Sequence, residues 1–361
     1  MKTDIARDLL LAPLTKQVNI TERRSIMPIL SNVLINFGKG RISMFSTDLE
    51  LSAISHVEYE GTTEKKVVIH GRKFLDILKE MDADVINFDI KDNTLTLRQK
   101  HSEFVLGLQD SDEFPEVKEI TGTQEFSVDG STFLEMIEKV QFAISSDETR
   151  YVLTGMYMTA SNGVLSVVGT DGFRMALYSK GIEGLEGFKG VIVPKRSVLE
   201  VGRVVGEGDT IRVVLGEKHV QFSTGSVVLI SRLIEGGFPD YENVIPKTNS
   251  NIAKAEKAKL IKGLRKVSTI ISKSEPVKVT LRENELAIEA ESDVGKARES
   301  IEVEYQGDEL TLNFNVRFVV DVINHIDQKE IFIKAPTGYG AVLFEGDEKD
   351  TYKNIVMPIR V

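Results

Sequence analysis

The sequence predicts an α+β fold made of three tandem copies of one domain, each with two helices packed on antiparallel sheets. Two observations predict it. One set of sequence markers recurs three times at a common spacing, and short alternating strand patterns surround two helical segments in each copy. The spacing of about 120 residues exceeds the roughly 20–50 residues of solenoid repeats and has the length of a domain.

The first marker is an alternating strand that ends in Thr-Asp or Ser-Asp. It occurs as "GRISMFSTD", "GVLSVVGTD" and "NELAIEAESD". The aspartates Asp48, Asp171 and Asp293 that close these stretches lie 123 and 122 residues apart. A shared spacing between three such stretches indicates internal duplication.

Two further markers follow the same spacing. The stretches "GRKFLDIL", "KRSVLEV" and "VRFVVDV" share an arginine followed by apolar residues and an acid, and their arginines lie 124 and 121 residues apart. Pro115 and Pro239, in "EFPEV" and "GFPDYENVIP", lie 124 residues apart. We therefore expect three domains, at residues 1–122, 123–246 and 247–361.

Each copy is expected to hold seven or eight strands and two helices. In the first copy the strands are "NVLINF", "RISMFS", "HVEYE", "KKVVIH", "VINFDI", "TLTLRQ" and "EFVLGL", which alternate apolar and polar residues. The first helix of each copy is expected over 4–18, 131–145 and 256–272, where apolar residues have helical spacing. The arginine-marked stretches predict the second helices. Pro13 is expected to kink or delay the first helix. Helices separated by runs of hairpin strands exclude a βαβ nucleotide-binding fold.

Composition limits the function. The chain has no cysteine, no apolar run of membrane-spanning length and no signal peptide at its N-terminus, so we expect a cytoplasmic protein. Its five histidines are scattered without metal-ligand spacing, so no metal or cofactor is expected. The net charge of −10 argues against general DNA binding unless positive charge is confined to one surface.

The stretch "VVGTDGFRMAL" at 167–177 resembles a loop with chemistry in it. An enzyme using Asp171 and Arg174 is one hypothesis, but no nucleophile, metal set or base accompanies them in the sequence. A turn is favoured, because aspartate side chains bond nearby backbone amides in tight turns. No catalytic residue is therefore expected.

Positive charge gathers on one predicted helix. Residues 251–275 hold seven lysines and arginines against two glutamates in an otherwise acidic chain. A solvated helix face and a weak, sequence-independent phosphate-binding surface explain this run equally well.

The sequence resembles the β subunit of bacterial DNA polymerase III, the sliding clamp family. The resemblance rests on segments that span the whole chain in family order: "MPILSNVLI", "STDLEL", "RYVLTGM", "GTDGFRMAL", "IVPKRSVLE", "GFPDYENVIP", "FNVRFVVDVI" and the terminal "VMPIRV". It implies clamp-type domains and a processivity factor of the DNA polymerase, not an enzyme.

The resemblance further implies half of a six-domain ring, closed as a head-to-tail homodimer around duplex DNA. The ring would slide without sequence specificity and would tether the polymerase catalytic subunit, the clamp loader and other proteins through a hydrophobic peptide pocket between the second and third domains. The alternative is a repeat-built protein-interaction scaffold that does not encircle DNA.

The resemblance also assigns residues to these roles. The peptide pocket would be lined by Leu153, Thr170, Gly172, Phe173, Arg174, Met175, Pro239, Val244, Asn315, Phe318, Ile355, Met357, Pro358, Ile359 and Arg360. The DNA-facing residues would be Arg24, Arg72, Lys73, Tyr151, Lys195 and Arg196. At the dimer interface, Phe104 and Leu106 of one chain would meet Ile270 and Ile271 of the other.

Overall fold

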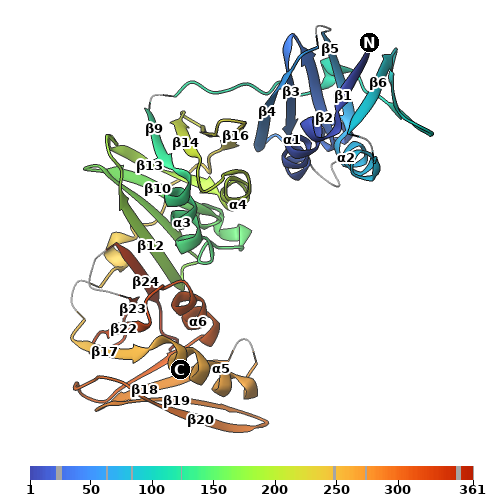
Figure 1. Ribbon diagram of the computed structural model, residues 1–361. Helices are drawn as coiled ribbons and strands as arrows, with labels where there is room; N and C mark the ends of the chain where they lie inside the picture. Colours follow the sequence, from blue (N-terminus) through green and yellow to red (C-terminus); the bar gives the residue numbers. More distant parts are fainter. Residues whose placement is uncertain are drawn as a thin grey trace. The chain divides into compact units, whose positions relative to one another are not determined.

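The structure is a computed structural model that describes residues 1–21, 27–61, 64–82, 84–122, 124–246, 249–272, 275–346 and 351–360. These residues, whose helices and strands are labelled in Figure 1, form two compact units, residues 1–134 with 196–233, and residues 135–195 with 234–361. The element order strand, helix, four strands, helix, three strands runs three times through the described residues. The predicted repeat is therefore present as a repeated fold.

The elements of the three copies correspond one to one. The first copy holds β1 Lys2–Ala6, α1 Arg7–Ile20, β2 Asn32–Gly38, β3 Gly40–Thr47, β4 Leu51–Tyr59, β5 Lys65–His70, α2 Gly71–Glu80, β6 Val85–Lys91, β7 Thr94–Gln99 and β8 Ser102–Gly107. The second holds β9 Gln124–Asp129, α3 Gly130–Gln141, β10 Gly155–Ser161, β11 Val164–Thr170, β12 Arg174–Gly181, β13 Phe188–Pro194, α4 Lys195–Val204, β14 Thr210–Leu215, β15 His219–Ser223 and β16 Val227–Arg232. The third holds β17 Asn251–Glu256, α5 Lys257–Val267, β18 Val277–Arg282, β19 Glu285–Ser292, β20 Gly295–Glu302, β21 Leu310–Phe314, α6 Val316–Asn324, β22 Glu330–Ala335, β23 Val342–Glu345 and β24 Tyr352–Val356.

The strands of each copy form two antiparallel ladders. The second to fifth strands give one ladder, as in β5-β2-β3-β4, and the first and last three give the other, as in β1-β6-β7-β8. Ladders of neighbouring copies then join edge to edge. β4 pairs with β16 and β12 pairs with β24, which produces two eight-stranded sheets. β8 and β20 remain at the edges of the two four-stranded sheets.

The helices cover one face of these sheets with apolar side chains. In the first copy Leu10 and Leu14 of α1 and Phe74 of α2 are fully buried with Phe88 of β6. In the third copy α5 packs so closely on β20 that a Cβ on Gly263 would lie 2.7 Å from the Cδ1 atom of Ile301. A larger residue at this position would therefore require the end of the Ile301 side chain to shift.

Of the two effects expected of Pro13, a kink or a delay of the first helix, the delay is wrong. α1 begins at Arg7 and runs through Pro13 to Ile20. A proline inside a helix removes one backbone hydrogen bond. Burial of Leu10 and Leu14 on either side of Pro13 stabilises the helix in spite of that loss.

Each edge-to-edge joint is covered, on the sheet face opposite the helices, by the segment that leads to the next copy. At the joint of β4 and β16, Ile54, Val228 and Ile230 pack with Val117 and Ile120. At the joint of β12 and β24, the cluster Val168, Met175, Leu177, Leu343 and Ile355 packs with Phe238, Tyr241 and Ile245. Apolar residues on this face of the joints are thus shielded from water.

No helix among the described residues has the length and apolar character needed to cross a membrane.

Candidate peptide pocket and basic surfaces

The corner between β11 and β12 is built by side-chain hydrogen bonds to its own backbone. Asp171 Oδ1 accepts from the amides of Phe173 and Arg174, each at 3.0 Å. Thr170 Oγ1 accepts from the Gly172 amide at 3.1 Å, and Gly172 has a φ of 85°. This φ favours glycine. The turn interpretation of Asp171 therefore agrees with its geometry.

The other copies use the same device with one change. Asp48 Oδ1 accepts from the amides of Glu50 and Leu51 at 3.0 and 2.7 Å. In the third copy the acceptor is Ser292, one residue before Asp293, and its Oγ bonds the Val294 amide at 3.3 Å. The repeated aspartates mark repeated turns in the first two copies.

Arg174 fixes the corner to the rest of its unit. Its Nε lies 3.0 Å from Asp171 Oδ2, its Nη1 lies 2.6 Å from Asp321 Oδ2, and its Nη2 donates to the Phe142 carbonyl at 2.9 Å. The guanidinium lies 4.6 Å from the ring centre of Phe318, within cation–π distance. With its side chain only 12% exposed, Arg174 is a positioning residue for the surface beside it.

A cavity of about 110 Å³ opens next to this corner. Of the residues assigned to the peptide pocket, ten surround it: Leu153, Thr170, Gly172, Phe173, Arg174, Met175, Pro239, Val244, Ile355 and Met357. Strands β11, β12 and β24 supply the floor through the β12–β24 pairing, in which Met175 lies opposite Ile355. The cavity is small, apolar and partly open, which suits the insertion of one or two apolar side chains.

Two aromatic residues line the cavity that sequence reasoning did not assign. Phe238 and Tyr241 border it, and the Phe238 ring stacks on Tyr157 at 4.6 Å between ring centres. Burial, with a smaller contribution from the nearby Glu242, raises the pKa of Tyr241 to about 12. Both residues flank Pro239 in "GFPDYENVIP". The stretch that served as a repeat marker therefore also contains the two aromatic residues that could have been assigned to the pocket.

Phe318 and the C-terminal tail extend the surface beyond the cavity. The rings of Phe173 and Phe318 stack at 6.3 Å, and Phe173 is 51% exposed. The Met357 amide donates to the Phe173 carbonyl at 2.8 Å, which places the tail along this pair. The Ile359 amide then donates to the Asn313 carbonyl at 2.7 Å.

The remaining assigned residues hold this tail and α6 in place. Asn315 caps α6 by accepting from the Arg317 amide at 3.0 Å. The Pro358 carbonyl accepts from the Tyr339 hydroxyl at 2.8 Å, and Arg360 lies over the Tyr339 ring at 4.2 Å. Asn315, Phe318, Pro358, Ile359 and Arg360 thus lie around the cavity without being among the residues that line it.

Some of the residues assigned to DNA contact are exposed, and others are bound by neighbouring protein groups. Arg24 lies outside the described residues. Arg72 and Lys73 lie in the first turn of α2, and Lys73 is exposed. Arg196 forms an ion pair with Asp48 and donates to the Ile20 carbonyl at 2.9 Å. These contacts anchor Arg196 to the first copy.

Lys195 and Tyr151 lie in the other unit. The Lys195 ammonium donates to the Ile144 carbonyl at 2.9 Å and to Ser146 Oγ at 3.3 Å, and burial lowers its pKa. Tyr151, in the short helix Glu148–Leu153, is 57% exposed. Lys195 is therefore held by protein oxygens, whereas Tyr151 faces solvent.

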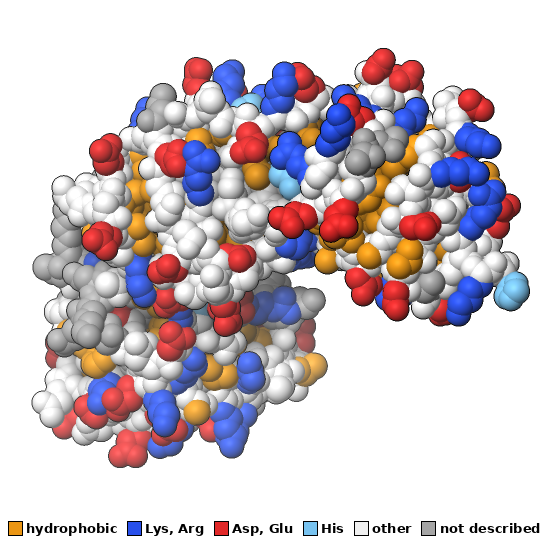
Figure 2. Space-filling model, turned by 45° about the horizontal axis from the view of Figure 1, so that its top comes forward, with side chains coloured by type: hydrophobic (Ala, Val, Ile, Leu, Met, Phe, Trp, Pro, Cys, Tyr) orange, Lys and Arg blue, Asp and Glu red, His pale blue; other side chains and the backbone are white. Residues whose placement is uncertain are grey.

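The positive run at 251–275 is a helix face. Along α5 the apolar side buries Leu260, Leu264 and Val267, and the exposed side carries Lys259, Lys262, Arg265 and Lys266. Lys259 and Lys266 pair with Glu256 and Glu299 at 3.0 and 2.5 Å. Within the described ranges Lys262 and Arg265 form no ion pair, and Lys273 of this run lies outside those ranges. Acidic and basic side chains are interspersed on the face of the molecule drawn in Figure 2.

The residues assigned to the dimer interface lie on β8 and beside β20, each an edge strand of a four-stranded sheet. Phe104 and Leu106 of β8 are half-buried against the first-copy core. Ile270 and Ile271 are partly buried against the third-copy core, and the Ile270 carbonyl accepts from Ser292 Oγ at 2.6 Å. This bond places Ile270 at the turn that leads into β20.

Comparison with known proteins assigns the chain to a family. Residues 1–118, 127–240 and 242–360 match the N-terminal, central and C-terminal domains of the DNA polymerase III beta subunit. The beta sliding clamps of Pseudomonas aeruginosa and Caulobacter vibrioides are 31% and 32% identical to this chain, and each match covers the whole of both chains.

Solved structures agree with the sequence matches. The DNA polymerase III subunit beta from Pseudomonas aeruginosa superposes with a TM-score of 0.95 at 29% identity over the whole of both chains. The beta subunit from Thermotoga maritima gives 0.92 at 29% identity, over all of this chain and 99% of that one. A Pseudomonas aeruginosa sliding clamp bound to griselimycin superposes with a TM-score of 0.94 at 29% identity over the whole of both chains.

Three repeated clamp domains define a sliding clamp, an accessory subunit that makes a DNA polymerase processive. Within that class the chain belongs to the family of bacterial DNA polymerase III beta subunits.

Proposed function

We propose that this chain closes with a second copy into a head-to-tail ring of six domains that encircles duplex DNA. One observation carries the proposal. In each of the two joints within the chain, the fourth strand of one copy pairs with the eighth strand of the next, as β4 with β16 and β12 with β24. The fourth strand of the third copy, β20, and the eighth strand of the first, β8, are the two left over. A second chain supplies the missing partner for each, and a two-fold axis closes the ring.

The strand registers of the joints predict the register of this seam. Ser52 pairs with Ile230 in the first joint, and Met175 pairs with Ile355 in the second. The strand pairing within each copy places Lys296 of β20 at the position of Ser52 and Met175. It places Val105 of β8 at the position of Ile230 and Ile355. Lys296 of one chain is therefore expected opposite Val105 of the other. Arg298 then lies opposite Glu103 of the other chain, a cross-strand pair of opposite charges.

The outward-facing residues of β8 and β20 differ in polarity from those of the strands that form the two joints. The joints present apolar residues such as Ile54 and Leu177 under a covering segment. At the positions corresponding to Ile54 and its partner Val228, β20 carries Arg298 and β8 carries Glu103. No linker crosses a seam between chains, so charges replace apolar residues there and also protect the free edges from unspecific pairing.

DNA would be held by the ring and contacted weakly. Exposed cations on α2 and α5, together with Tyr151 and Arg196, would meet phosphates without reading bases, which permits sliding. The polymerase catalytic subunit, the clamp loader and other proteins would dock short apolar motifs in the cavity beside Met175 and Ile355. The chain would work in the cytoplasm, without catalytic chemistry of its own.

Retention on DNA tests the ring. With a clamp loader supplied, the protein should stay on nicked circular DNA and leave the same DNA after one cut makes it linear. Sedimentation should show a dimer. Equal retention on both forms, or a monomer that still binds its partners, would support the scaffold hypothesis instead.

A further inference from the structure

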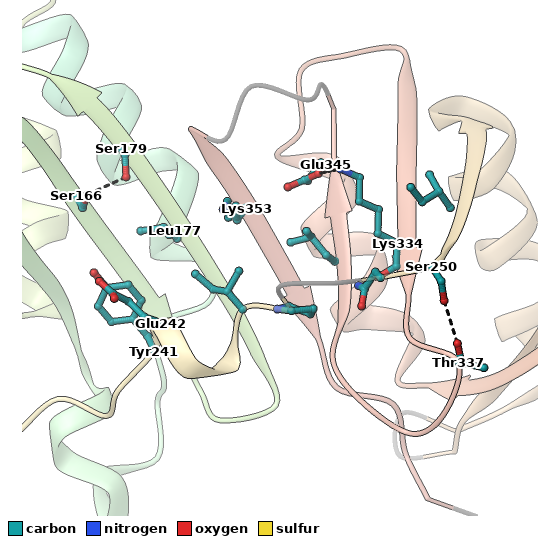
Figure 3. Close-up of a pocket in the computed structure, with 15 residues that line it drawn as sticks. Ser166, Leu177, Ser179, Tyr241, Glu242, Ser250, Lys334, Thr337, Glu345 and Lys353 are labelled. Atoms are coloured by element: carbon teal, nitrogen blue, oxygen red, sulfur yellow. Dashed lines mark hydrogen bonds and ion pairs between the residues drawn. The ribbon is translucent and has the colours of Figure 1, made fainter.

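A second hollow, of about 1050 Å³, lies on the same sheet face as the apolar pocket and is far larger than its 110 Å³. We call it the polar groove. Figure 3 shows its two walls: Ser166 and Ser179 on β11 and β12 on one side, and Lys334 and Glu345 on β22 and β23 on the other. Tyr241 and Glu242 border it from the segment that joins the second and third copies.

The groove and the apolar pocket share one floor. On β12 and β24, Met175 pairs with Ile355 under the pocket, and Leu177 pairs with Lys353 under the groove. These pairs are two residues apart on the same face, which is about 7 Å along a strand. Tyr241 borders both hollows, so a single aromatic side chain with its segment divides them.

The walls of the groove offer neutral hydrogen-bonding groups. Ser166 and Ser179 bond each other at 2.8 Å, and Ser250 and Thr337 do so at 2.9 Å (Figure 3). Each hydroxyl pair uses one of its two protons in that bond and keeps further acceptor sites. Asn249 Nδ2 donates to the Lys334 carbonyl at 2.5 Å, and its buried Oδ1 has no hydrogen-bond donor among the described residues.

The charges of the groove balance. Lys334 and Glu345 form an ion pair at 2.6 Å, and Glu345 is 4% exposed. Lys353 and Glu242 add one charge of each sign. A polyanion would face two carboxylates, and an apolar ligand would leave the hydroxyl and amide groups without partners. A polar, uncharged polypeptide segment satisfies both conditions.

We infer that the polar groove is the second part of the partner-docking site. It binds a polar, uncharged segment of the same partner chain whose apolar motif occupies the pocket, an inference that rests on the proposed peptide-binding role of that pocket. An extended chain advances about 3.3 Å per residue, so two to three residues past the last apolar anchor reach the groove over Tyr241. The pocket then selects the motif, and the groove selects what flanks it.

A display library tests this inference. The core peptide is Ac-Ser-Leu-Ser-Leu-Phe-amide, whose leucine and phenylalanine side chains fit an apolar cavity, and the library adds six random residues at either end. Selection uses the full-length protein. Fluorescence anisotropy then compares core and selected peptides on the wild type and on Ser179→Arg and Thr337→Arg, which fill the groove from opposite walls and leave the pocket residues intact.

Selected extensions should be rich in serine, threonine, asparagine and glutamine and should bind about tenfold more tightly than the core. Both variants should lose this gain and keep the affinity for the core peptide, which also shows that they are folded. Extensions that give no gain, or a gain that survives both variants, would overturn the inference. A core peptide that fails to bind the wild type would instead overturn the proposed role of the pocket.

Discussion

Arg174 Nη1 lies 2.6 Å from Asp321 Oδ2, and this ion pair ties β12 of the second copy to α6 of the third. The same guanidinium bonds Asp171 and the Phe142 carbonyl and stacks on Phe318. One side chain therefore holds a wall of the apolar pocket in register with the helix that carries Phe318. The position of the pocket wall depends on this pair.

We expect Asp321→Asn to weaken binding of the core peptide about fivefold. The substitution keeps the side-chain volume and removes the charge that orients Arg174. Because Asp321 is 45% exposed, the free energy of unfolding should fall by less than about 1 kcal/mol. Titration by fluorescence anisotropy and urea denaturation measure the two effects.

Asp327→Asn is the matched control. Asp327 also forms an ion pair, with its Oδ1 atom 2.6 Å from Lys139 Nζ, but it is not among the residues that line the pocket. Its variant should bind the core peptide as the wild type does. Equal losses of affinity in both variants would show that the fold and not the Arg174 contact had changed.

Deletion of residues 357–361 should abolish binding of the polymerase catalytic subunit and the loader and leave the dimer intact. The deletion removes Met357 from the cavity lining and the Ile359 amide bond to Asn313, whereas β8 and β20 are untouched. Surface plasmon resonance and sedimentation measure the two properties. Undiminished partner affinity after the deletion would show that the pocket is misplaced.

Much of the fold could be predicted because the chain repeats it. Marker stretches such as those around Asp48 and Asp171 identified turns whose hydrogen bonds recur in the structure. The helices were found from apolar spacing, and α5 buries Leu260 and Leu264 as expected. The path of α1 through Pro13 could not be predicted, because tertiary burial decides whether a helix tolerates a proline.

The candidate site was predictable in part. Ten pocket residues surround one cavity, but the resemblance and not the residues alone singled them out, since apolar spacing does not separate a pocket from a core. The polar groove left no signal in sequence, because Ser179, Lys334 and Ser250 come together only when β12, β22 and the joining segment meet. Sequence spacing cannot report such cross-strand neighbours.

Replacing Ile270 and Ile271 by alanine together should convert the dimer into monomers. Both side chains are partly buried beside the turn into β20, where Phe104 and Leu106 of the second chain would pack. Removing their apolar surface weakens a seam made of two short strands. Sedimentation velocity at micromolar concentration measures the outcome. A persistent dimer would refute this assignment of the interface.

The predicted seam register can be tested by exchanging charges. Arg298→Glu should weaken dimerisation about tenfold, because it places two acids opposite each other at Glu103. Glu103→Arg alone should weaken it similarly, and the double variant should recover most of the loss. Within one chain Arg298 lies near Glu285 and Glu289 and Glu103 near Arg98, so monomer stability of each variant is measured in parallel. Absence of recovery in the double variant would exclude this register.

The buried carboxyl group of Glu200 is expected to make the free energy of unfolding depend on pH. Its side chain on α4 is 3% exposed, and its Oε2 has no hydrogen-bond donor among the described residues. Burial raises the pKa of this carboxyl, and the nearby Arg203 and Arg196 oppose the rise only in part. The pKa of Glu200 is therefore higher in the folded state than in the unfolded state. Its contribution to the stability of the fold is fully present at pH values below the unfolded pKa, and it is lost as the pH rises through the folded pKa.

Glu200→Gln should consequently raise the melting temperature by a few °C at pH 8 and change it less at pH 4, which lies below the raised pKa of the native carboxyl. Differential scanning calorimetry at pH 4, 6 and 8 measures this. Glu50→Gln is the control, because Glu50 is an exposed carboxylate whose pair with Arg232 at 3.4 Å is solvated. A gain for Glu200→Gln that is equal at pH 4 and pH 8 would assign the effect to packing and not to the buried charge.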